Sequence, residues 1–310
     1  MAAPSAGRPR LSAVNGLLLL NKPAGLTSNQ ALQKVKRLLK AKKAGHTGSL
    51  DPAATGMLPL CFGEATKVCA YLLEADKSYR VTARLGEATD TGDADGTVNQ
   101  TAAVPALSAE QWEGISERFI GDIEQVPPMY SALKQQGKRL YELARKGQVV
   151  EREARRVKIL ELDLLEAHGA RLVFRVRCSK GTYVRTLVED IAKAGGTVAH
   201  TAALHRETVG HFCSQDMLEL AAAESIAAAG PEALLEYLLP PDRALQGWPE
   251  LTIASDAARS FADGQVIAAG RSEPAAAGPV RVYDATGFLG VGELSSDGRL
   301  TPRRLFRAAR

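Results

Sequence analysis

The sequence has few cysteines, few aromatic residues and no long apolar run. Neither a zinc site nor a disulfide framework is indicated, because no CxxC spacing occurs among the four cysteines, Cys61, Cys69, Cys178 and Cys213. No stretch approaches the roughly 18 apolar residues of a membrane-spanning helix, and residues 1–14 lack the apolar segment of a signal peptide. We therefore expect a cytoplasmic protein with reduced thiols, no membrane association and a disordered tail at residues 1–14.

Acidic residues are absent from the first fifty positions. Asp51 is the first of them, and nine Lys or Arg residues precede it. The net charge is only +4, but basic residues gather in two segments: residues 28–50 hold six Lys or Arg and no acid, and residues 134–158 hold nine against three Glu. Such clustering is typical of a surface that binds a polyanion. A solvated helix face is the alternative for either segment alone.

The hydrophobic pattern mixes helices and strands. Thr27 and Gln30 form a capping box at the start of an amphipathic helix that we expect to end at Gly45. Alternation of apolar and polar residues predicts half-buried antiparallel strands at 79–85, 157–165 and 171–178. Further helices are expected at 64–74, 108–120, 182–194 and 216–239. Because no strict βαβ repeat is present, the fold class is predicted to be α+β.

The character of the chain changes near residue 240. Two prolines and a polar link lead to Pro249, and short apolar stretches between glycine-rich turns follow. A length of 310 residues also favours about two domains. We predict a first domain at residues 15–245 and a small β module of about 60 residues at 248–310.

Residues 45–63, GHTGSLDPAATGMLPLCFG, place Asp51 among glycines and prolines. Proline lacks a backbone donor and glycine favours special dihedral angles, so we expect an ordered loop that leads into a short strand at 57–62, and no regular helix or central strand around Asp51. Ordered loops of this kind often carry function. Composition alone leaves two interpretations open, an Asp-Pro turn and a catalytic loop.

A family resemblance rests on five segments in order: NKPAGLTS (21–28), GHTGSLDPAATGMLPLCFGEATK (45–67), KSYRV (77–81), PPMYSALK (127–134) and CSKGTYVRTLVEDI (178–191). Together they resemble the TruB-type tRNA pseudouridine synthases over most of residues 16–212. The resemblance implies a pseudouridine-synthase fold with a mixed, largely antiparallel central sheet flanked by helices, and a PUA-like β-barrel at the C-terminus. It implies an isomerase that acts on uridine 55 in the T-loop, with a mobile RNA-clamping insertion at about 125–158. The expected partner is the T-arm of tRNA, bound by a monomer.

The resemblance assigns Asp51 as the catalytic aspartate and Arg185 as its ion-pair partner. Isomerisation breaks the bond between N1 and C1′, rotates the uracil and joins C5 to the sugar without a redox step, so no cofactor or metal is required. A carboxylate suits this reaction as nucleophile or base toward the ribose. Arg185 is predicted in the first turn of a helix, where the dipole disfavours a cation, and Asp51 would supply the compensating anion. A neighbouring cation also keeps a carboxylate ionised.

The same resemblance assigns substrate contacts. Tyr79 is the aromatic residue that stacks on the flipped uracil and takes the C5 proton, although its place on an apolar strand face also suits a core residue. His46 enters the T-loop and holds flipped-out bases. Lys22 lies in the NKPAG turn, first as support for the catalytic loop and second as a substrate contact. Tyr183 and Leu204 complete the predicted substrate-binding residues.

Several features keep alternatives open. The acidic turn ATDTGDADG at 88–96 resembles a calcium loop, but Thr91 stands where the first Asp is needed and no Glu follows at the required offset. His205 and Glu207 replace two residues of the Arg-Arg-Thr sequence more often found in the family, which bears on RNA contacts. Two other functions are open: a tRNA-binding folding factor, a role compatible with the isomerase activity, and an aspartate-dependent hydrolase of small glycosides. A hydrolase needs a second carboxylate, and the five segments offer no obvious one.

Overall fold

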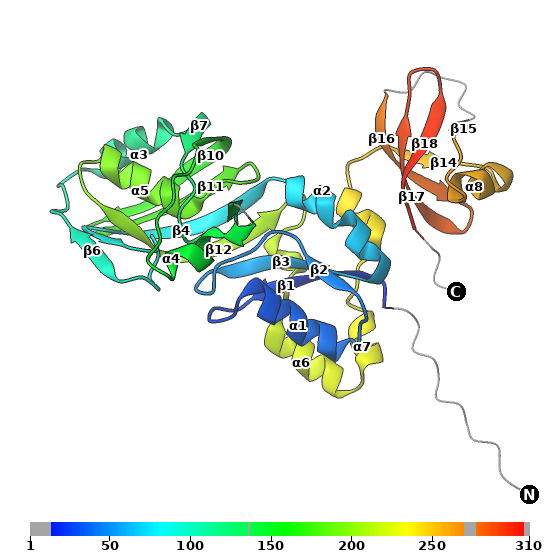
Figure 1. Cartoon of the computed structure of the whole chain (residues 1–310), viewed down its shortest axis with the longest axis horizontal. Coiled ribbons are helices and arrows are strands. Elements are labelled where there is room, and N and C mark those ends of the chain that lie inside the picture. The colour runs from blue at the N-terminus through cyan, green and yellow to red at the C-terminus, as the bar shows by residue number, and fades with distance from the viewer. Residues whose placement is uncertain (1–13, 136, 270–276, 307–310) are drawn as a thin grey trace, which may run out of the picture.

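A computed structural model describes residues 14–135, 137–269 and 277–306. Its centre is a nine-stranded mixed sheet in the order β13-β1-β3-β12-β4-β11-β10-β7, with β2 also paired to β3 (Figure 1). Most of its neighbouring strands are antiparallel, and the α+β class with a largely antiparallel sheet is confirmed. The predicted disordered tail lies outside the described residues, apart from Val14. The strands of this sheet are β1 (Gly16–Lys22), β2 (Ala44–His46), β3 (Thr55–Phe62), β4 (Lys77–Leu85), β7 (Gly121–Gln125), β10 (Arg155–His168), β11 (Arg171–Cys178), β12 (Ala199–Val209) and β13 (Leu218–Glu219).

Strand β3 lies in the middle of the sheet although it contains Pro59. One edge of β3 pairs with β1 along its length, and the other edge is divided between β2 at residues 60–62 and β12 at residues 55–56. Pro59 O accepts a hydrogen bond from Thr47 N at 3.1 Å on the divided edge, so the proline nitrogen faces the interval where no strand pairs. The predicted strand at 57–62 is confirmed and begins two residues earlier, at Thr55, but its central place in the sheet contradicts the expectation that this segment holds no central strand.

Helix α1 (Ser28–Leu38) begins as predicted. Gln30 N donates to Thr27 Oγ1 and Thr27 N donates to Gln30 Oε1, which completes the capping box. The helix ends before the expected Gly45, because Lys40 adopts a φ of 50° and the chain then enters the sheet as β2. The apolar side of α1 packs on β1, β3 and α6 (Leu220–Ala228), so its lysines lie toward solvent.

Helices α3 (Ala109–Glu117) and α5 (Val184–Ala194) pack on one face of β4, β10 and β11 (Figure 1). The predicted alternation of β4 is confirmed, because Tyr79 and Val81 face this core while Arg80 is exposed. Burial of a large apolar side chain contributes roughly 1.5–3 kcal/mol, so this core fixes both β4 and the start of α5.

Two of the predicted helices are interrupted. The segment at 64–74 begins as a 3-10 helix, η1 (Gly63–Val68), and continues as α2 (Cys69–Glu74). The segment at 216–239 is not one helix: it comprises η2 (Ser214–Asp216), β13, α6 and α7 (Pro231–Leu235). The break between α6 and α7 falls at Gly230, whose φ is 128°, and at Pro231, which cannot donate to a continuous helix.

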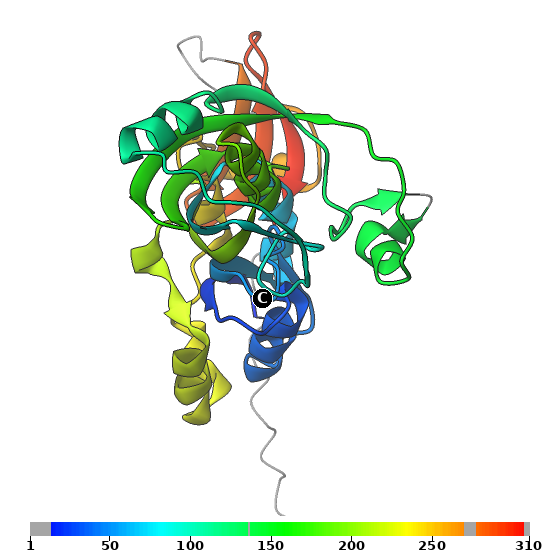
Figure 2. The same cartoon turned by 90° about the vertical axis from the view of Figure 1, so that its left-hand side faces the viewer.

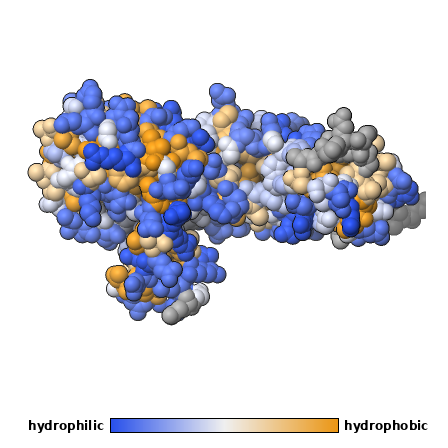
Figure 3. Space-filling view, turned by 90° about the horizontal axis from the view of Figure 1, so that it is seen from above, coloured by the Kyte–Doolittle hydropathy of each residue, from blue (hydrophilic) through white to orange (hydrophobic). Residues whose placement is uncertain are grey.

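The segment predicted as an RNA-clamping insertion stands away from the sheet. Strands β8 (Lys134–Gln135) and β9 (Lys138–Arg139) form a small hairpin, and α4 (Leu140–Ala144) follows. Figure 2 shows this unit to one side of the body, and in Figure 3 it forms a separate and largely hydrophilic lobe. A further hairpin, β5 (Glu87–Thr89) with β6 (Val98–Thr101), encloses most of the acidic turn.

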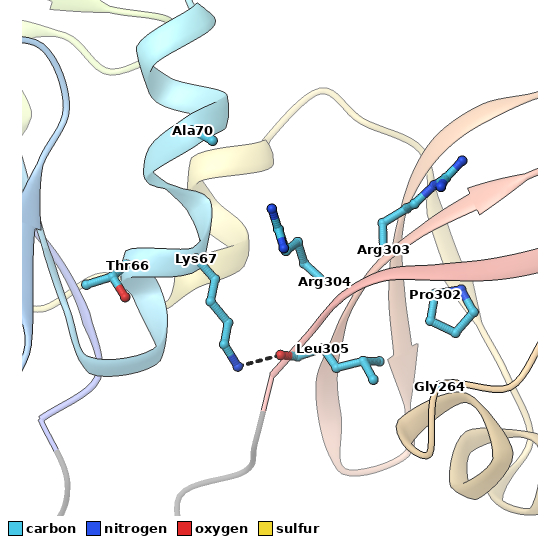
Figure 4. Close-up of a pocket in the computed structure, with 8 residues that line it drawn as sticks. All are labelled: Thr66, Lys67, Ala70, Gly264, Pro302, Arg303, Arg304 and Leu305. Atoms are coloured by element: carbon cyan, nitrogen blue, oxygen red, sulfur yellow. Dashed lines mark hydrogen bonds between the residues drawn. The ribbon is translucent and has the colours of Figure 1, made fainter. Parts of the chain in front are cut away.

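The C-terminal residues form a second sheet in the order β14-β16-β17-β18-β15, with α8 (Ser255–Ala262) packed on it (Figure 1). A 3-10 helix, η3 (Pro241–Leu245), precedes this sheet. At the junction of the two sheets, Lys67 Nζ of η1 donates to Leu305 O at 2.7 Å beside a cavity of about 550 Å³ (Figure 4). Arg303 and Arg304 also line this cavity, so the junction is basic. The strands of this sheet are β14 (Glu250–Thr252), β15 (Ile267–Ala268), β16 (Gly278–Asp284), β17 (Gly287–Leu294) and β18 (Arg299–Leu305).

Candidate active site

A cleft of about 310 Å³ lies where the loop between β2 and β3 meets β4, β12 and the start of α5. It brings together five of the seven residues predicted from the sequence, namely Asp51, Tyr79, Tyr183, Arg185 and Leu204. The other two, Lys22 and His46, do not line it. The cleft is therefore lined by residues more than 150 positions apart in the chain, such as Asp51 and Leu204.

The loop that carries Asp51 is fixed on both sides of that residue. Leu50 N donates to Ser28 Oγ at 2.8 Å, and Ser28 Oγ donates to Leu50 O at 3.1 Å. Gly25 N donates to Pro52 O at 2.9 Å. These contacts attach the loop to α1 and to the turn between β1 and α1, while 42% of the Asp51 side chain stays exposed.

Arg185 is the second residue of α5, and only 6% of its side chain is exposed. Its Nε lies 3.1 Å from Asp51 Oδ2, and its Nη1 lies 3.4 Å from Asp93 Oδ2. Nη1 also donates to Thr91 O at 2.5 Å, and Nη2 donates to Tyr130 O at 2.7 Å. Two carboxylates thus compensate a cation at a helix N-terminus, where the dipole disfavours positive charge. The acidic turn, to which the sequence assigned no role, supplies the second of them.

The ionisation of Asp51 reflects two opposed influences. Burial raises the pKa of the Asp51 carboxyl above its ordinary value, and Arg185 opposes this rise only in part, while Asp93 adds to it. From the sequence we expected only the neighbouring cation to affect the pKa of Asp51. Because the carboxylate is still partly exposed, water moderates the desolvation. A base that fills the cleft excludes this water and strengthens the attraction between Asp51 and Arg185.

A second carboxylate is close to Asp51, although the five segments showed no obvious one. Asp93 binds a different nitrogen of Arg185, and only 12% of its side chain is exposed. It does not line the cleft, where Asp51 is the only carboxylate among the described residues. Asp93 therefore anchors Arg185 and does not face the cleft.

Tyr79 and Arg206 face each other across β4 and β12. They are direct partners in the antiparallel register, so their side chains lie on the same face of the sheet, and both line the cleft. Burial raises the pKa of the Tyr79 phenol, and the Arg206 guanidinium opposes this rise. Arg206 Nε donates to Met57 O at 2.6 Å and Nη2 donates to Gly48 O at 3.0 Å. This arginine connects the Asp51 loop, β3 and Tyr79.

Lys22 supports the loop from within the protein. Its side chain is fully buried, and Nζ donates to Pro23 O at 2.8 Å, to Leu26 O at 2.7 Å and to Pro52 O at 3.2 Å. Burial lowers the pKa of Lys22 to about 8, and the nearby Asp51 opposes the fall. This geometry suits the supporting role that the sequence placed first, and the substrate contact stays a prediction.

The other three predicted residues differ in their position relative to the cleft, which Tyr183 and Leu204 line and His46 does not. His46 lies on β2, where its Nδ1 is buried without a hydrogen-bond partner among the described residues, and burial lowers its pKa below the ordinary value. Tyr183 precedes α5, and its N donates to Gln125 Oε1 at 3.0 Å. Leu204 lies opposite Val81 in the sheet and faces the cleft. The roles of all three as substrate contacts stay predictions.

Sequence reasoning missed three charged residues of the site, which are Lys77, Asp93 and Arg206. The Lys77 side chain is buried; its Nζ donates to Leu73 O at 3.0 Å and to Ala75 O at 2.5 Å, and burial lowers its pKa to about 8. A signal for the two basic residues was available in the alternation of the strands. Lys77 shares a face with Tyr79, and Arg206 shares a face with Leu204, so each is a charge on the side that the pattern marks as buried.

The described residues contain no group of three or more His, Cys, Asp or Glu side chains placed to hold a metal ion. In that same part of the chain, no helix combines the length and the apolar character needed to cross a membrane. All four cysteines are free, and their reduced state in the cell stays a prediction.

The order of the central sheet and the small C-terminal sheet have counterparts in solved structures. A chain in the crystal structure of a Cbf5-Nop10-Gar1 complex aligns with a TM-score of 0.72 and 23% identity, covering 100% of this chain and 92% of that chain. A chain of the archaeal box H/ACA Nop10-Cbf5 complex aligns with a TM-score of 0.70, also at 23% identity, covering 99% and 91%. At this identity the likeness establishes the fold.

Sequence comparison identifies the family. The model of the TruB family pseudouridylate synthase N-terminal domain matches residues 36–184, the tRNA pseudouridylate synthase B C-terminal domain matches 185–246, and the pseudouridine synthase II TruB C-terminal model matches 249–306. A tRNA pseudouridine synthase B of Pseudomonas aeruginosa (strain UCBPP-PA14) is 52% identical over 297 residues, covering 95% of this chain and 97% of that protein. One of Chromohalobacter salexigens is 50% identical over 304 residues, covering 98% of each. The chain belongs to the TruB family of pseudouridylate synthases.

Proposed function

We propose that this protein isomerises uridine 55 in the T-loop of tRNA to pseudouridine, as an intramolecular transferase that uses Asp51. The family establishes the class of reaction, and the relatives are named for action on tRNA. The observation that carries the proposal is the pairing of Asp51 with Arg185 at 3.1 Å in a cleft that Tyr79 also lines. The cytoplasmic location and the monomeric state expected from the sequence stay predictions.

The composition of the cleft favours isomerisation over hydrolysis. A glycosidase needs two carboxyl groups about 5–9.5 Å apart on either side of the bond, with one of them as the acid. Asp51 is the only carboxylate among the described residues that line this cleft, and it is accompanied by Lys77, Arg185 and Arg206. One carboxylate toward the ribose, with cations beside it, suits a reaction in which the detached uracil carries negative charge and rejoins the same sugar.

The size of the cleft supports base flipping. A volume of about 310 Å³ is too small for a helical stem, so a target uridine has to leave the stack to reach Asp51. Tyr79 then offers an aromatic face, which is a sequence-tolerant platform for a base. Selection of one uridine is therefore expected to come from the fold of the RNA around the cleft.

Basic surfaces outside the cleft support a tRNA partner. Strands β8 and β9 expose Lys134, Lys138 and Arg139 of the second basic cluster, and α1 exposes Arg37 of the first. The cavity at the junction of the two sheets adds Arg303 and Arg304. Contacts with phosphates supply affinity without reading sequence, so we expect tRNA binding to weaken steeply as salt rises.

The decisive variant is Asp51→Asn, with Asp163→Asn on the exposed side of β10 as the control. We expect Asp51→Asn to abolish pseudouridine formation in a T-arm hairpin and in full-length tRNA, and to leave tRNA affinity within about tenfold, because phosphate and shape contacts supply most of it. Pseudouridine mapping after treatment with the purified protein is the measurement. Modification by Asp51→Asn, a product at another position, or release of free uracil by the wild-type protein would each contradict the proposal.

A further inference from the structure

Arg206 is a buried cation without a carboxylate partner. The residue is only 1% exposed, and no Asp or Glu of the described residues forms an ion pair with it, whereas Arg185 pairs with two. Its hydrogen bonds go to two main-chain carbonyls, Met57 O and Gly48 O. Burial of an uncompensated guanidinium is costly, so this placement calls for an interaction beyond packing.

Part of that interaction is structural. Arg206 lies at the point where β12 stops pairing with β3, and Met57 O projects from the divided edge of β3, where no strand pairs with it. The Arg206 side chain therefore substitutes for a missing strand and also holds Gly48 at the start of the Asp51 loop. Neutral donors can also satisfy these carbonyls, so hydrogen bonding to them does not by itself require a positive charge.

The charge of Arg206 acts on the opposite residue of the sheet. Tyr79 is its direct partner across β4 and β12, which brings the two Cβ atoms within about 5.5 Å on one face. The other ionisable groups on which Arg206 acts are mainly basic, since its charge also lowers the pKa of Lys22, His46 and Lys77. Tyr79 is the cleft-lining group whose oxygen has to carry negative charge, as a phenolate, before it can serve as a base.

We propose that Arg206 positions the Tyr79 hydroxyl and stabilises its phenolate, the form that removes the C5 proton. The inference rests on the proposed function. After C5 has bonded to C1′, the Tyr79 hydroxyl gives its proton to N1, which had kept the electron pair of its broken bond to C1′. The resulting phenolate takes the proton from C5, and the electron pair of the C5–H bond restores the ring double bond, so Tyr79 ends as a neutral hydroxyl and no proton is gained or lost. Arg206 is a positioning residue.

A double-mutant cycle tests this coupling. Arg206→Lys keeps the charge but loses the planar fork, and we expect it to slow single-turnover pseudouridine formation about 10–100-fold with tRNA affinity within about threefold. Tyr79→Phe alone is expected to cost about 10²–10⁴-fold, the usual contribution of a positioned proton acceptor. In the Tyr79→Phe background, Arg206→Lys should then cost no more than about threefold. The matched control is Arg80→Lys, which changes the exposed arginine next to Tyr79 on the opposite face of β4 and should leave the rate unchanged.

A C5-deuterated T-arm hairpin provides a second readout that a merely structural arginine does not move. If Arg206 assists loss of the C5 proton, Arg206→Lys enlarges the isotope effect on the single-turnover rate relative to the wild-type protein. Arg206→Gln, which keeps N–H donors for the carbonyls, replaces Arg206→Lys if the latter does not fold. Multiplicative losses in the cycle, or an unchanged isotope effect, overturn the inference. A wild-type protein that forms no pseudouridine overturns the proposed function instead, so the two failures are distinguishable.

Discussion

Removal of one negative charge at Asp93 should disturb the active site without a change in its shape. Asp93 Oδ1 accepts from Thr91 Oγ1 at 2.6 Å and from Asp95 N at 3.2 Å, and an asparagine side-chain oxygen can keep both hydrogen bonds. Oδ2 is the atom that lies 3.4 Å from Arg185 Nη1. Asp93→Asn therefore keeps the hydrogen bonds of the turn and replaces the anionic acceptor that faces Arg185 with a neutral amide group.

The expected loss of stability and rate in Asp93→Asn follows from the distance between Asp93 and Arg185 and from the burial of both side chains. Two unit charges 3.4 Å apart attract by about 5 kcal/mol at an effective dielectric constant of about 20. Arg185 keeps Asp51 and two carbonyls as partners, so the net loss should be closer to that of one charge-assisted hydrogen bond, about 1.5–3 kcal/mol. If a similar amount is lost from the orientation of Arg185 in the transition state, the rate falls about 10–100-fold.

The assay is single-turnover pseudouridine formation in a T-arm hairpin, together with urea unfolding of the same samples. Asp95→Asn is the matched control, because Asp95 lies in the same turn, is exposed and forms no ion pair with Arg185 among the described residues. We expect the control to stay within about threefold of the wild-type rate. A wild-type rate and stability for Asp93→Asn, or an equal loss in both variants, would refute the reasoning.

Two further predictions concern buried and surface cations. The pKa of Lys22 is lowered from 10.5 to about 8. Between these pH values the lysine is neutral in the folded protein and protonated in the unfolded chain, so the unfolded chain binds more protons. The contribution of Lys22 to the free energy of unfolding should therefore rise by about 3 kcal/mol from pH 8 to pH 10.5. Lys22→Met should flatten that rise in urea unfolding, and an identical pH profile would contradict the burial argument. Arg304→Ala should weaken binding of full-length tRNA several-fold and reduce its salt dependence by about one phosphate contact, with no effect on an isolated T-arm hairpin. Arg259→Ala on α8 is the control, and a loss shared by the hairpin would place the contact elsewhere.

The sequence predicted the elements that have strong local patterns. The capping box at Thr27 and the buried face of β4 rest on neighbours within a few residues, and both are confirmed. The central position of β3 was missed, because local composition does not show that the proline nitrogen of Pro59 faces an unpaired interval.

The same limit applies to the site. The pairing of Arg185 with Asp51 was expected from the family resemblance, and the structure shows the contact. The role of Asp93 was left open, because a hydrogen-bonded turn far along the chain reaches Arg185 only in the folded protein. Arg206 was overlooked because its partners are two carbonyls and a cross-strand tyrosine, none of which is near it in sequence.

Pro59 also limits what the sheet can become. If residue 59 could donate a hydrogen bond, β2 could extend along the divided edge of β3 toward β12 and form one continuous ladder. Such a ladder would take up Met57 O, displace Arg206 and draw the Asp51 loop into the sheet. The proline therefore acts as a permanent spacer: it keeps the divided edge of β3 open beside the cleft, so that the Asp51 loop and Arg206 retain their places there.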